Sequence, residues 1–317
     1  VIAINNKNEF GDFLKVLDAV YDKTDNWCKP LNIEKSMAFS KKQPIFDHLT
    51  WAGWVGYLNG IPSGRITAQI DKLYIDEENC KTGFIGFFEA CNNDELIASL
   101  FTAAETWLNQ SSVKKILGPL SFNINQEVGL LIEGFQTPPN IMMPNGKKHY
   151  QYAFERHGYY KSMDIYCYDI AARFKPPPLM TKLLKLLPNE LKTRALDKNK
   201  IADDLETLRL IFNDAWSGNW GFTPFPKKEF LHLGREMLKI IPNNFIQIAE
   251  INGEPVAFIA LIPNINPIIH SMNGKILPFG WVKLLYHLKW KYPKQARIPL
   301  MGVKKKYHNT KLGPGLA

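Results

Sequence analysis

The C-terminal stretch of the chain carries the residues whose chemistry is most apparent. No Asp or Glu follows Glu254, whereas ten Lys and Arg residues do. These are Lys275, Lys283, Lys289, Lys291, Lys294, Arg297, Lys304, Lys305, Lys306 and Lys311. A positive field of this kind favours a polyanion, such as nucleic acid, an anionic membrane surface or a phosphate-rich cofactor. A solvated basic face is the alternative interpretation.

Aromatic rings and side-chain amides form a second group of candidates. In the second half of the chain they are Asn213, Trp216, Asn219, Trp220 and Phe222. In the first half, the long link from Leu120 to His149 contains Asn125 and Met142. We expect both groups to line an acceptor site, and a link as long as 120–149 without structure of its own is often functional. Packing of the tryptophans into the core is the alternative.

Two carboxylates are candidates for a general base, Glu133 and Glu250. A carboxylate can accept a proton from a reacting group, although most lone glutamates are solvated. The sequence shows neither a GxSxG pattern nor a Cys/His arrangement for a covalent nucleophile. Its four cysteines have no metal-site or CxxC spacing. We therefore expect no metal and a reducing, cytoplasmic location.

Composition limits the class of protein that can position these residues. The chain has 317 residues, 45% of them hydrophobic and 22% charged, which is ordinary for a globular protein of two domains or one large one. No apolar run approaches the roughly 20 residues of a membrane span. No signal-peptide pattern is present at the start.

Hydrophobic periodicity predicts alternating helices and strands in the first half. Turn-forming residues separate the predicted elements. Helices are expected over 9–20, 94–108 and 150–157, and strands over 54–57, 65–70, 84–90, 115–118 and 162–170. The Pro176–Pro178 run then predicts a stiff connector, which divides the chain into domains 1–175 and 176–317.

The second half repeats this series. Helices are predicted over 202–216 and 227–240, a hairpin over 245–251 and 255–262 around Asn252-Gly253, and a strand over 296–303. The chain stops about 50 residues before the series of the first half would be complete. We therefore expect a polypeptide truncated at its C-terminus. The fold class predicted is α/β, of the α+β type with mixed sheets, in two tandem domains.

The order of these elements resembles the acyl-CoA N-acyltransferase (GNAT) superfamily. Residues 250–257 look like the central hairpin of that family, with Ala257 at a position usually held by Gly. Residues 154–159 are similar to its closing helix. Fragments such as Gly118-Pro119 and Asn219-Trp220-Gly221-Phe222 extend the resemblance to a bacterial group of tandem GNAT-fold proteins. The first domain would be a GNAT-like copy, and the second an incomplete acyl-CoA-binding GNAT-like domain.

The resemblance implies a CoA site in the second domain. The family's diphosphate loop matches His308, Asn309, Thr310, Lys311, Leu312 and Gly313. Backbone amides at a helix start bind anions, and the final Gly is present. Lys311 replaces the central Gly, and the neighbouring lysines could offset that departure with direct charge. An amide near Met301 to Val303 would stabilise the oxyanion. The implied donor is acetyl-CoA or a longer acyl-CoA.

The implied reaction is direct transfer of the acyl group to a small-molecule or peptide amine. The first domain is expected to be a non-catalytic copy. Its equivalent loop, 90–95, lacks glycine and contains Asp94 and Glu95, which repel a diphosphate. Phe154 stands where the family often has a proton-donating Tyr.

Two other functions remain open. A Fem-type aminoacyl or peptidyl transferase would also use tandem GNAT-like domains, but the helical hairpin that tRNA binding would favour is not evident. A non-catalytic ligand-binding module is favoured by the imperfect loops. We expect no nucleic-acid partner, because no RNA- or DNA-binding motif accompanies the lysines. The sequence makes no prediction of oligomeric state.

Overall fold

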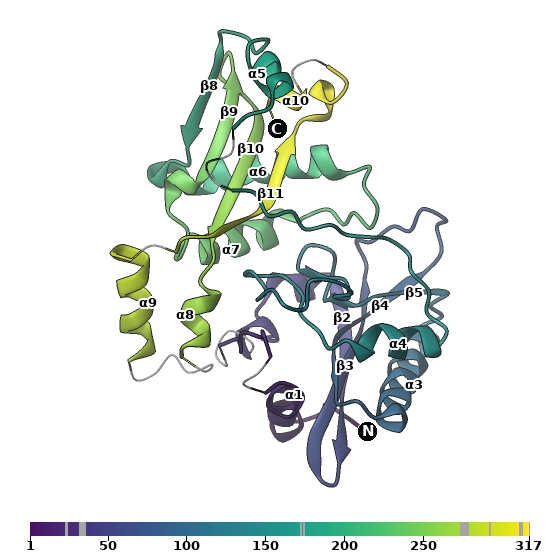
Figure 1. The fold of residues 1–317 in the computed structure, drawn as a ribbon. Helices are drawn as coiled ribbons and strands as arrows, with labels where there is room; N and C mark the ends of the chain where they lie inside the picture. Colours follow the sequence, from purple (N-terminus) through teal and green to yellow (C-terminus); the bar gives the residue numbers. More distant parts are fainter. Residues whose placement is uncertain are drawn as a thin grey trace. The chain divides into compact units, whose positions relative to one another are not determined.

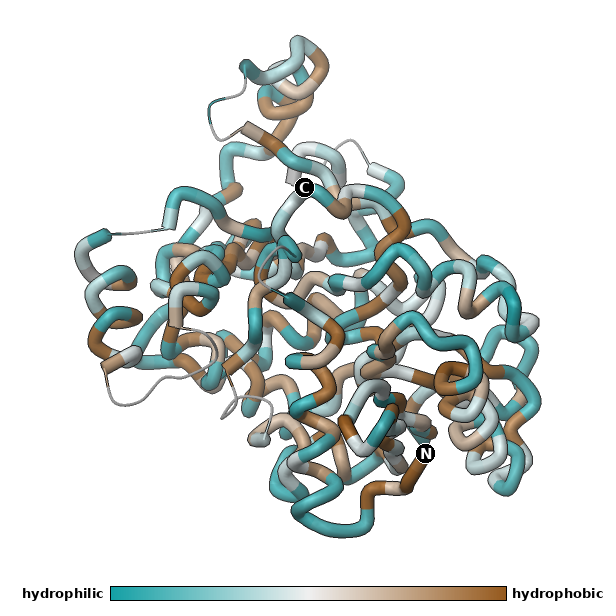
Figure 2. The backbone as a smooth tube through the Cα atoms, turned by 60° about the horizontal axis from the view of Figure 1, so that its bottom comes forward, coloured by the Kyte–Doolittle hydropathy of each residue, from teal (hydrophilic) through white to brown (hydrophobic). Residues whose placement is uncertain are grey.

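The computed structural model describes residues 1–22, 25–31, 36–171, 173, 175–272, 279–291, 293–310 and 313–316. The chain forms two compact units, each with its own sheet (Figure 1). Unit 1 comprises Val1–Asp164 and Ile265–Tyr292, and unit 2 comprises Ile165–Asn264 and Pro293–Ala317. Colours change repeatedly from hydrophilic to hydrophobic along the helices in Figure 2, as expected of helices that bury one face.

Unit 1 is built on a five-stranded sheet in the order β1-β2-β3-β4-β5. Its strands are β1 (Ile2–Ala3), β2 (Leu49–Leu58), β3 (Ile61–Asp71), β4 (Thr82–Ala90) and β5 (Lys115–Leu117). All neighbours are antiparallel except β4 and β5, which are parallel. A separate short pair consists of β6 (Leu120–Ser121) and β7 (Glu127–Val128).

Helices cover both faces of this sheet (Figure 1). On one face lies α1 (Lys7–Val20), which starts at a capping box formed by Asn6 and Glu9. On the other lie α3 (Asp94–Gln110), capped by Asn93, and α4 (His149–Arg156). The helix start predicted at residue 94 is confirmed. The 3-10 turn η1 (Pro44–Asp47) precedes β2.

Unit 2 has a four-stranded antiparallel sheet in the order β11-β10-β9-β8. The strands are β8 (Leu191–Ala195), β9 (Ile246–Ile251), β10 (Glu254–Pro263) and β11 (Ala296–Val303). The predicted hairpin is confirmed, with Asn252 and Gly253 at φ values of 52° and 80°. The helices and 3-10 turns are α5 (Pro178–Leu184), η2 (Lys198–Lys200), α6 (Ile201–Trp216), α7 (Lys227–Met237), η3 (Asn243–Phe245), η4 (Lys305–Tyr307) and α10 (Gly313–Leu316).

Two helices lie in the sequence between β10 and β11, where no helical insertion was evident. They are α8 (Asn266–His270) and α9 (Gly280–Lys289), and they contact each other within unit 1. Both are short, and most apolar residues of α9 face outward. The usual pattern of a buried apolar stripe therefore does not mark α9. None of the described helices has the length and apolarity needed to cross a bilayer.

One predicted strand is wrong. Residues 162–170 have the expected alternating character, but they are exposed and pair with no described strand. A strand requires a neighbouring edge that accepts its backbone hydrogen bonds. Alternation alone does not supply that edge.

Candidate functional site

The outer edge of β11 has peptide groups that pair with no described strand. Among the described strands, β11 pairs only with β10. The Lys304 amide donates to the Val256 carbonyl at 2.9 Å, and Gly302 pairs with Phe258. Because hydrogen-bonding directions alternate along an antiparallel strand, the peptide groups of Met301 and Val303 face away from the sheet. Two backbone amides therefore point outward at consecutive odd-numbered positions.

Side chains already satisfy the two outward carbonyls. The Trp216 indole donates from Nε1 to the Met301 carbonyl at 2.8 Å. The His308 ring lies with Nε2 2.6 Å from the Val303 carbonyl. In the described part of the chain, no acceptor is found for the amide of Met301 or Val303. The edge is thus a set of donors held in place by an indole and an imidazole, which suits an oxygen-bearing ligand.

Basic residues follow this edge directly. Lys304 and Lys306 bind the Glu254 carboxylate at 3.0 and 2.8 Å, and hydrogen bonding by Lys306 first and then Lys304 lowers the pKa of Glu254 to about 2. The Lys305 amide donates to Asp214 at 2.7 Å, while its exposed ammonium group forms no ion pair with described residues. This end of β11 can therefore bind an anion.

The predicted diphosphate loop is partly described. His308, Asn309 and Thr310 are exposed, and Lys311 and Leu312 lie outside the described residues. Gly313 begins α10, and a Cβ added there would lie 2.5 Å from the Tyr307 carbonyl. This close backbone approach requires glycine.

A small hollow of about 100 Å³ lies against the same strands. It is lined by Thr193, Gln247, Ala249, Ala257, Phe258, Ile259, Met301 and Val303. Pockets that enclose whole small molecules are several times larger. The hollow can accept the end of an apolar chain beside the outward amides.

In unit 1, the edge that corresponds to the open edge of β11 is covered by the unit's own backbone. In unit 1, β4 pairs with β5 from Thr82 to Phe84, and the backbone at Leu120 then crosses β4. A Cβ on Gly86 would lie only 1.8 Å from the Leu120 carbonyl, and the Gln69 amide donates to that carbonyl at 2.6 Å. The unit's own backbone thus occupies the corresponding space.

Sequence reasoning missed a buried polar cluster in unit 1. The carboxylate of Glu89 accepts hydrogen bonds at 2.7 Å from both the Tyr21 and the Tyr150 hydroxyl. Burial raises the pKa of Glu89, and the charge of nearby Arg65 and the two hydroxyls oppose that rise. Burial, followed by the charge of Glu89, raises the pKa of both tyrosines. The hydroxyls therefore remain protonated donors.

This cluster continues along one face of β3. Arg65, Thr67, Gln69 and Asp71 alternate along the strand and are buried. Asp71 lies 2.7 Å from His48 Nδ1. Arg65 Nε, Thr67 Oγ1 and Gln69 Oε1 have no hydrogen-bond partner among the described residues. The sequence signal was polar alternation at i, i+2 and i+4, which usually marks a solvent-facing side.

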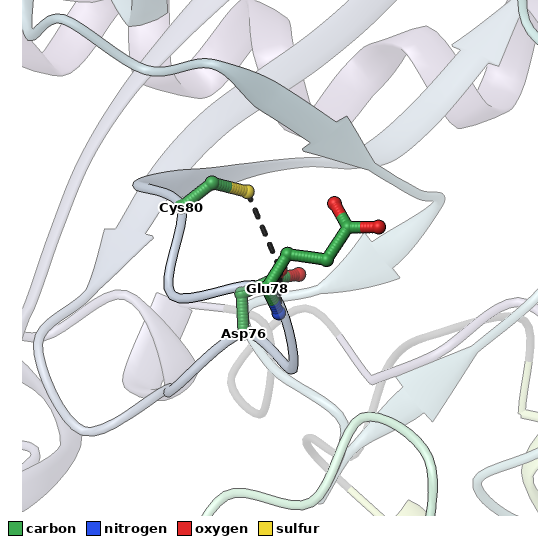
Figure 3. Close-up of side chains that lie close together, drawn as sticks. All are labelled: Asp76, Glu78 and Cys80. Atoms are coloured by element: carbon green, nitrogen blue, oxygen red, sulfur yellow. Dashed lines mark hydrogen bonds between the residues drawn. The ribbon is translucent and has the colours of Figure 1, made fainter.

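Asp76, Glu78 and Cys80 point toward one another in the turn between β3 and β4 (Figure 3). Asp76 accepts from the Lys115 ammonium at 3.0 Å, the Glu78 amide at 2.9 Å and the Cys80 thiol at 3.3 Å. Burial would raise the pKa of Asp76, but these three hydrogen bonds lower it to about 2. The lysine counter-ion and internal hydrogen bonds account for this cluster as a stabilised turn.

The two predicted bases lie in different settings. Glu250 is in β9 on the side facing α6, where its Oε1 accepts from Arg194 Nε at 2.7 Å. Arg194 also binds Asp204 through two hydrogen bonds of 2.8 Å. Glu133 is exposed on the long loop of unit 1.

The predicted substrate residues are also divided. Asn213 holds the Phe225 backbone through two hydrogen bonds, of 3.1 and 3.0 Å, and so has a structural role. Trp220 and Phe222 are half-buried, and Asn219 is exposed. Asn125 and Met142 are half-buried in unit 1. The other predicted substrate residues, between positions 213 and 222, belong to unit 2. Trp216 contacts the edge of β11.

Both units follow the same order of elements: a strand, helix-containing connections, then three consecutive antiparallel strands. In unit 1 this order continues through α3, β5 and α4. These features define a tandem GNAT-fold protein.

Several solved structures are similar to this chain. A tandem GNAT protein from the clavulanic acid biosynthesis pathway aligns with a TM-score of 0.48 and 11% identity, covering 99% of this chain and 81% of that one. Saccharomyces cerevisiae N-myristoyltransferase gives 0.38 and 15%, covering 82% and 56%. A putative acetyltransferase from Pyrococcus horikoshii gives 0.26 and 22%, covering 40% and 32%.

No family model matches the chain. Protein YghO of Escherichia coli (strain K12) is 41% identical over 313 residues, which is 98% of this chain and 80% of that protein. A Caulobacter vibrioides protein named bacterial ceramide synthase is 36% identical over 316 residues, covering 99% and 82%. The chain belongs to the family of these two proteins.

Proposed function

We propose that this protein is an N-acyltransferase that moves an acyl group from a CoA thioester directly onto an amine. The observation that carries the proposal is the open edge of β11, with the outward amides of Met301 and Val303. An extended thioester arm laid along this edge would accept these hydrogen bonds as an added strand does. The closed edge in unit 1 favours unit 2 as the donor site.

Charge after β11 supports binding of the CoA phosphates. Lys304, Lys305 and Lys306 lie where the arm would leave the strand. We assign His308, Asn309, Thr310 and Gly313 to the phosphate end, together with Lys311 and Leu312. Backbone amides and lysine ammonium groups both favour a diphosphate.

The proposed reaction requires no covalent intermediate with the protein. The amine nitrogen attacks the thioester carbonyl carbon, a C–N bond forms, and the carbonyl oxygen becomes an oxyanion. The amide of Met301 or Val303 donates to that oxyanion. The C–S bond then breaks, the thiolate takes a proton, and the amine's proton passes to a base. The products are an amide and free CoA.

Glu250 and Glu133 are the proposed bases. In Glu250, Oε1 is held by Arg194, so a proton would have to be taken by Oε2. Replacing each residue separately, as Glu250→Gln and Glu133→Gln, tests the assignment. Loss of the base is expected to lower kcat by about 10²–10⁴-fold.

The name of one relative supports a lipid substrate. Ceramide is an amide between a fatty acid and a long-chain amino alcohol, and the 36% identical relative is named for its synthesis. We therefore propose a fatty acyl-CoA as donor and a long-chain amino alcohol as acceptor. Trp216, Trp220 and Phe222 would contribute apolar surface for these chains, with Asn219 beside them, while Asn213 holds the backbone at Phe225. Asn125 and Met142 are the proposed acceptor contacts of unit 1.

The test is acyl transfer by the purified full chain. Acetyl-, octanoyl- and palmitoyl-CoA are supplied with sphinganine, while thiol release and amide mass are measured. Met301→Pro removes one outward amide without removing a ladder hydrogen bond, and Pro299 already occupies the preceding outward position. We expect kcat to fall about 10²–10³-fold, with Met301→Ala as the control that keeps the amide. No thiol release with any of the three thioesters, or equal activity of both variants, contradicts the proposal.

The helical pair α8–α9 keeps the Fem-type alternative open, because that function would favour a helical insertion. Separate calorimetric titrations with palmitoyl-CoA and aminoacyl-tRNA distinguish the two. Binding of the thioester alone supports the acyltransferase, and binding of the tRNA alone supports the Fem-type enzyme. Binding of neither supports a non-catalytic module.

A further inference from the structure

The helix α9 presents an apolar face to solvent. At 100° per residue, Trp281, Val282, Leu285 and Tyr286 share one side of the helix, and all four are exposed. Phe279 before the helix and Trp290 after it are 77% and 72% exposed. Contiguous aromatic and aliphatic exposure of this kind marks an interaction surface.

Another part of α9 is packed. Leu284 and Leu288 are half-buried, and α9 contacts α8. In turn, α8 is attached to unit 1 at both ends: Asn266 Nδ2 donates to the Pro139 carbonyl at 2.9 Å, and His270 Nδ1 lies 3.1 Å from the Trp27 carbonyl. The outward face therefore cannot turn inward without breaking this packing.

The charged residues of α9 and of the sequence that follows it are all of one sign. Lys283 and Lys289 belong to the helix, Lys291 and Lys294 follow it, and the sequence contains no acidic residue after Glu254. Tryptophan and tyrosine prefer the boundary between lipid headgroups and acyl chains, and lysine is attracted to anionic lipids. Apolar surface and positive charge together match an anionic bilayer.

We propose that α9 docks this protein on an anionic lipid bilayer. Its ten residues span about 15 Å, half the thickness of the hydrocarbon core, so the helix lies in the plane of the surface. Trp281, Leu285 and Trp290 enter the headgroup boundary. A second copy of the chain is a poorer occupant, since it would bring like-charged lysines together. RNA would leave the apolar face uncovered. The docking stands independently of acyl transfer.

Vesicle cosedimentation with the full chain tests the docking. The parent is expected to pellet with vesicles of 70% phosphatidylcholine and 30% phosphatidylglycerol, and more weakly with phosphatidylcholine alone. The triple variant Trp281→Ala, Leu285→Ala, Trp290→Ala is expected to bind at least about tenfold more weakly. The double variant Lys283→Glu, Lys291→Glu is expected to lose at least about 25-fold on the anionic vesicles, since each lysine contributes about fivefold.

The matched control removes exposed apolar surface elsewhere, by Ile61→Ala, Ile75→Ala and Tyr168→Ala, and is expected to bind as the parent does. Three results overturn the proposal: no pelleting with anionic vesicles, equal loss in the control, or loss of a dimer in the triple variant with vesicle binding unchanged. Transfer from a short acyl-CoA to a soluble amine, measured without vesicles, should be unaffected by the triple variant. The failure of docking is thus separable from the failure of catalysis.

Discussion

At Met301, the backbone carbonyl is bound by an indole and the backbone amide of the same residue is directed outward. Because the Met301 carbonyl already accepts a hydrogen bond from Trp216, the outward amide is the group left to bind a ligand. The strand edge therefore acts as a hydrogen-bond donor. At Gly86 in unit 1 the reverse holds, since the Leu120 carbonyl occupies the space a ligand would need. Under the proposed function, these single backbone positions decide which unit can receive a thioester.

Asp76→Asn tests the lysine-bound carboxylate of unit 1. The folded pKa of Asp76 is about 2, below the ordinary value of 3.8, so its stabilisation is present above pH 4 and is lost as pH falls toward 2. The variant should be less stable than the parent by about 2 kcal/mol at pH 7, and the difference should shrink between pH 4 and 3. Urea unfolding across this range measures it. The exposed Asp169→Asn serves as control, and a difference independent of pH contradicts the assignment.

Tyr150→Phe tests the buried cluster around Glu89. The hydroxyl donates to the carboxylate at 2.7 Å and accepts from the Ala90 amide at 3.0 Å, so its removal leaves two buried groups with one partner fewer. We expect a loss of about 2 kcal/mol in the free energy of unfolding. Tyr152→Phe, in the same helix with its side chain exposed, should change it little. Equal effects of the two substitutions would show that the cluster is not stabilising.

At the level of elements, the sequence predicted the positions of helices and turns well, and the burial of their side chains less well. The helix after Asn93 and the turn at Asn252-Gly253 were predictable because capping and hairpin chemistry are local. Arg65, Thr67 and Gln69 alternate with apolar residues, a pattern typical of a half-exposed strand, yet helices cover both faces of the sheet. Burial of that polar face depends on long-range packing. For the same reason, the ion pair of Glu250 with Arg194 could not be read from spacing.

Gly86→Ala tests the crossing of β4 by the segment after β5. The added Cβ would meet a backbone carbonyl at 1.8 Å, and the backbone must shift because that atom is not at the end of a flexible side chain. We expect a destabilisation of about 3 kcal/mol or more. Gly11→Ala, in the interior of α1 with no atom within 4 Å of the added Cβ, should instead stabilise by about 0.5–1 kcal/mol. Thermal unfolding of both variants provides the comparison, and a neutral Gly86→Ala would contradict the close crossing.

At the scale of the whole molecule, the two units share one order of helices and strands, but the edges of their sheets at β4 and β11 differ. In unit 1 the strand that corresponds to β11 is followed by α3 and has β5 beside it. Sequence comparison between the halves predicted this duplication, and the acidic loop 90–95 predicted that only the second copy binds a thioester. Which edge is physically open could not be predicted, because it depends on the path of the Leu120 backbone. Trp216 was predicted as a ligand contact without its role as a partner of Met301.

Hydrogen exchange with and without palmitoyl-CoA tests this division of roles across the chain. If the thioester lies along β11, the outward amides of Met301 and Val303 gain an acceptor, and peptides covering Leu300–Lys306 should exchange more slowly. Binding at 100 times Kd stabilises the native state by about 2.7 kcal/mol, enough to slow local opening about 100-fold. Peptides of β4 (Thr82–Ala90) should be unchanged, since Leu120 already fills that edge. Equal protection of both strands would show that the two copies bind donor alike, and protection of β4 alone would assign the donor to unit 1.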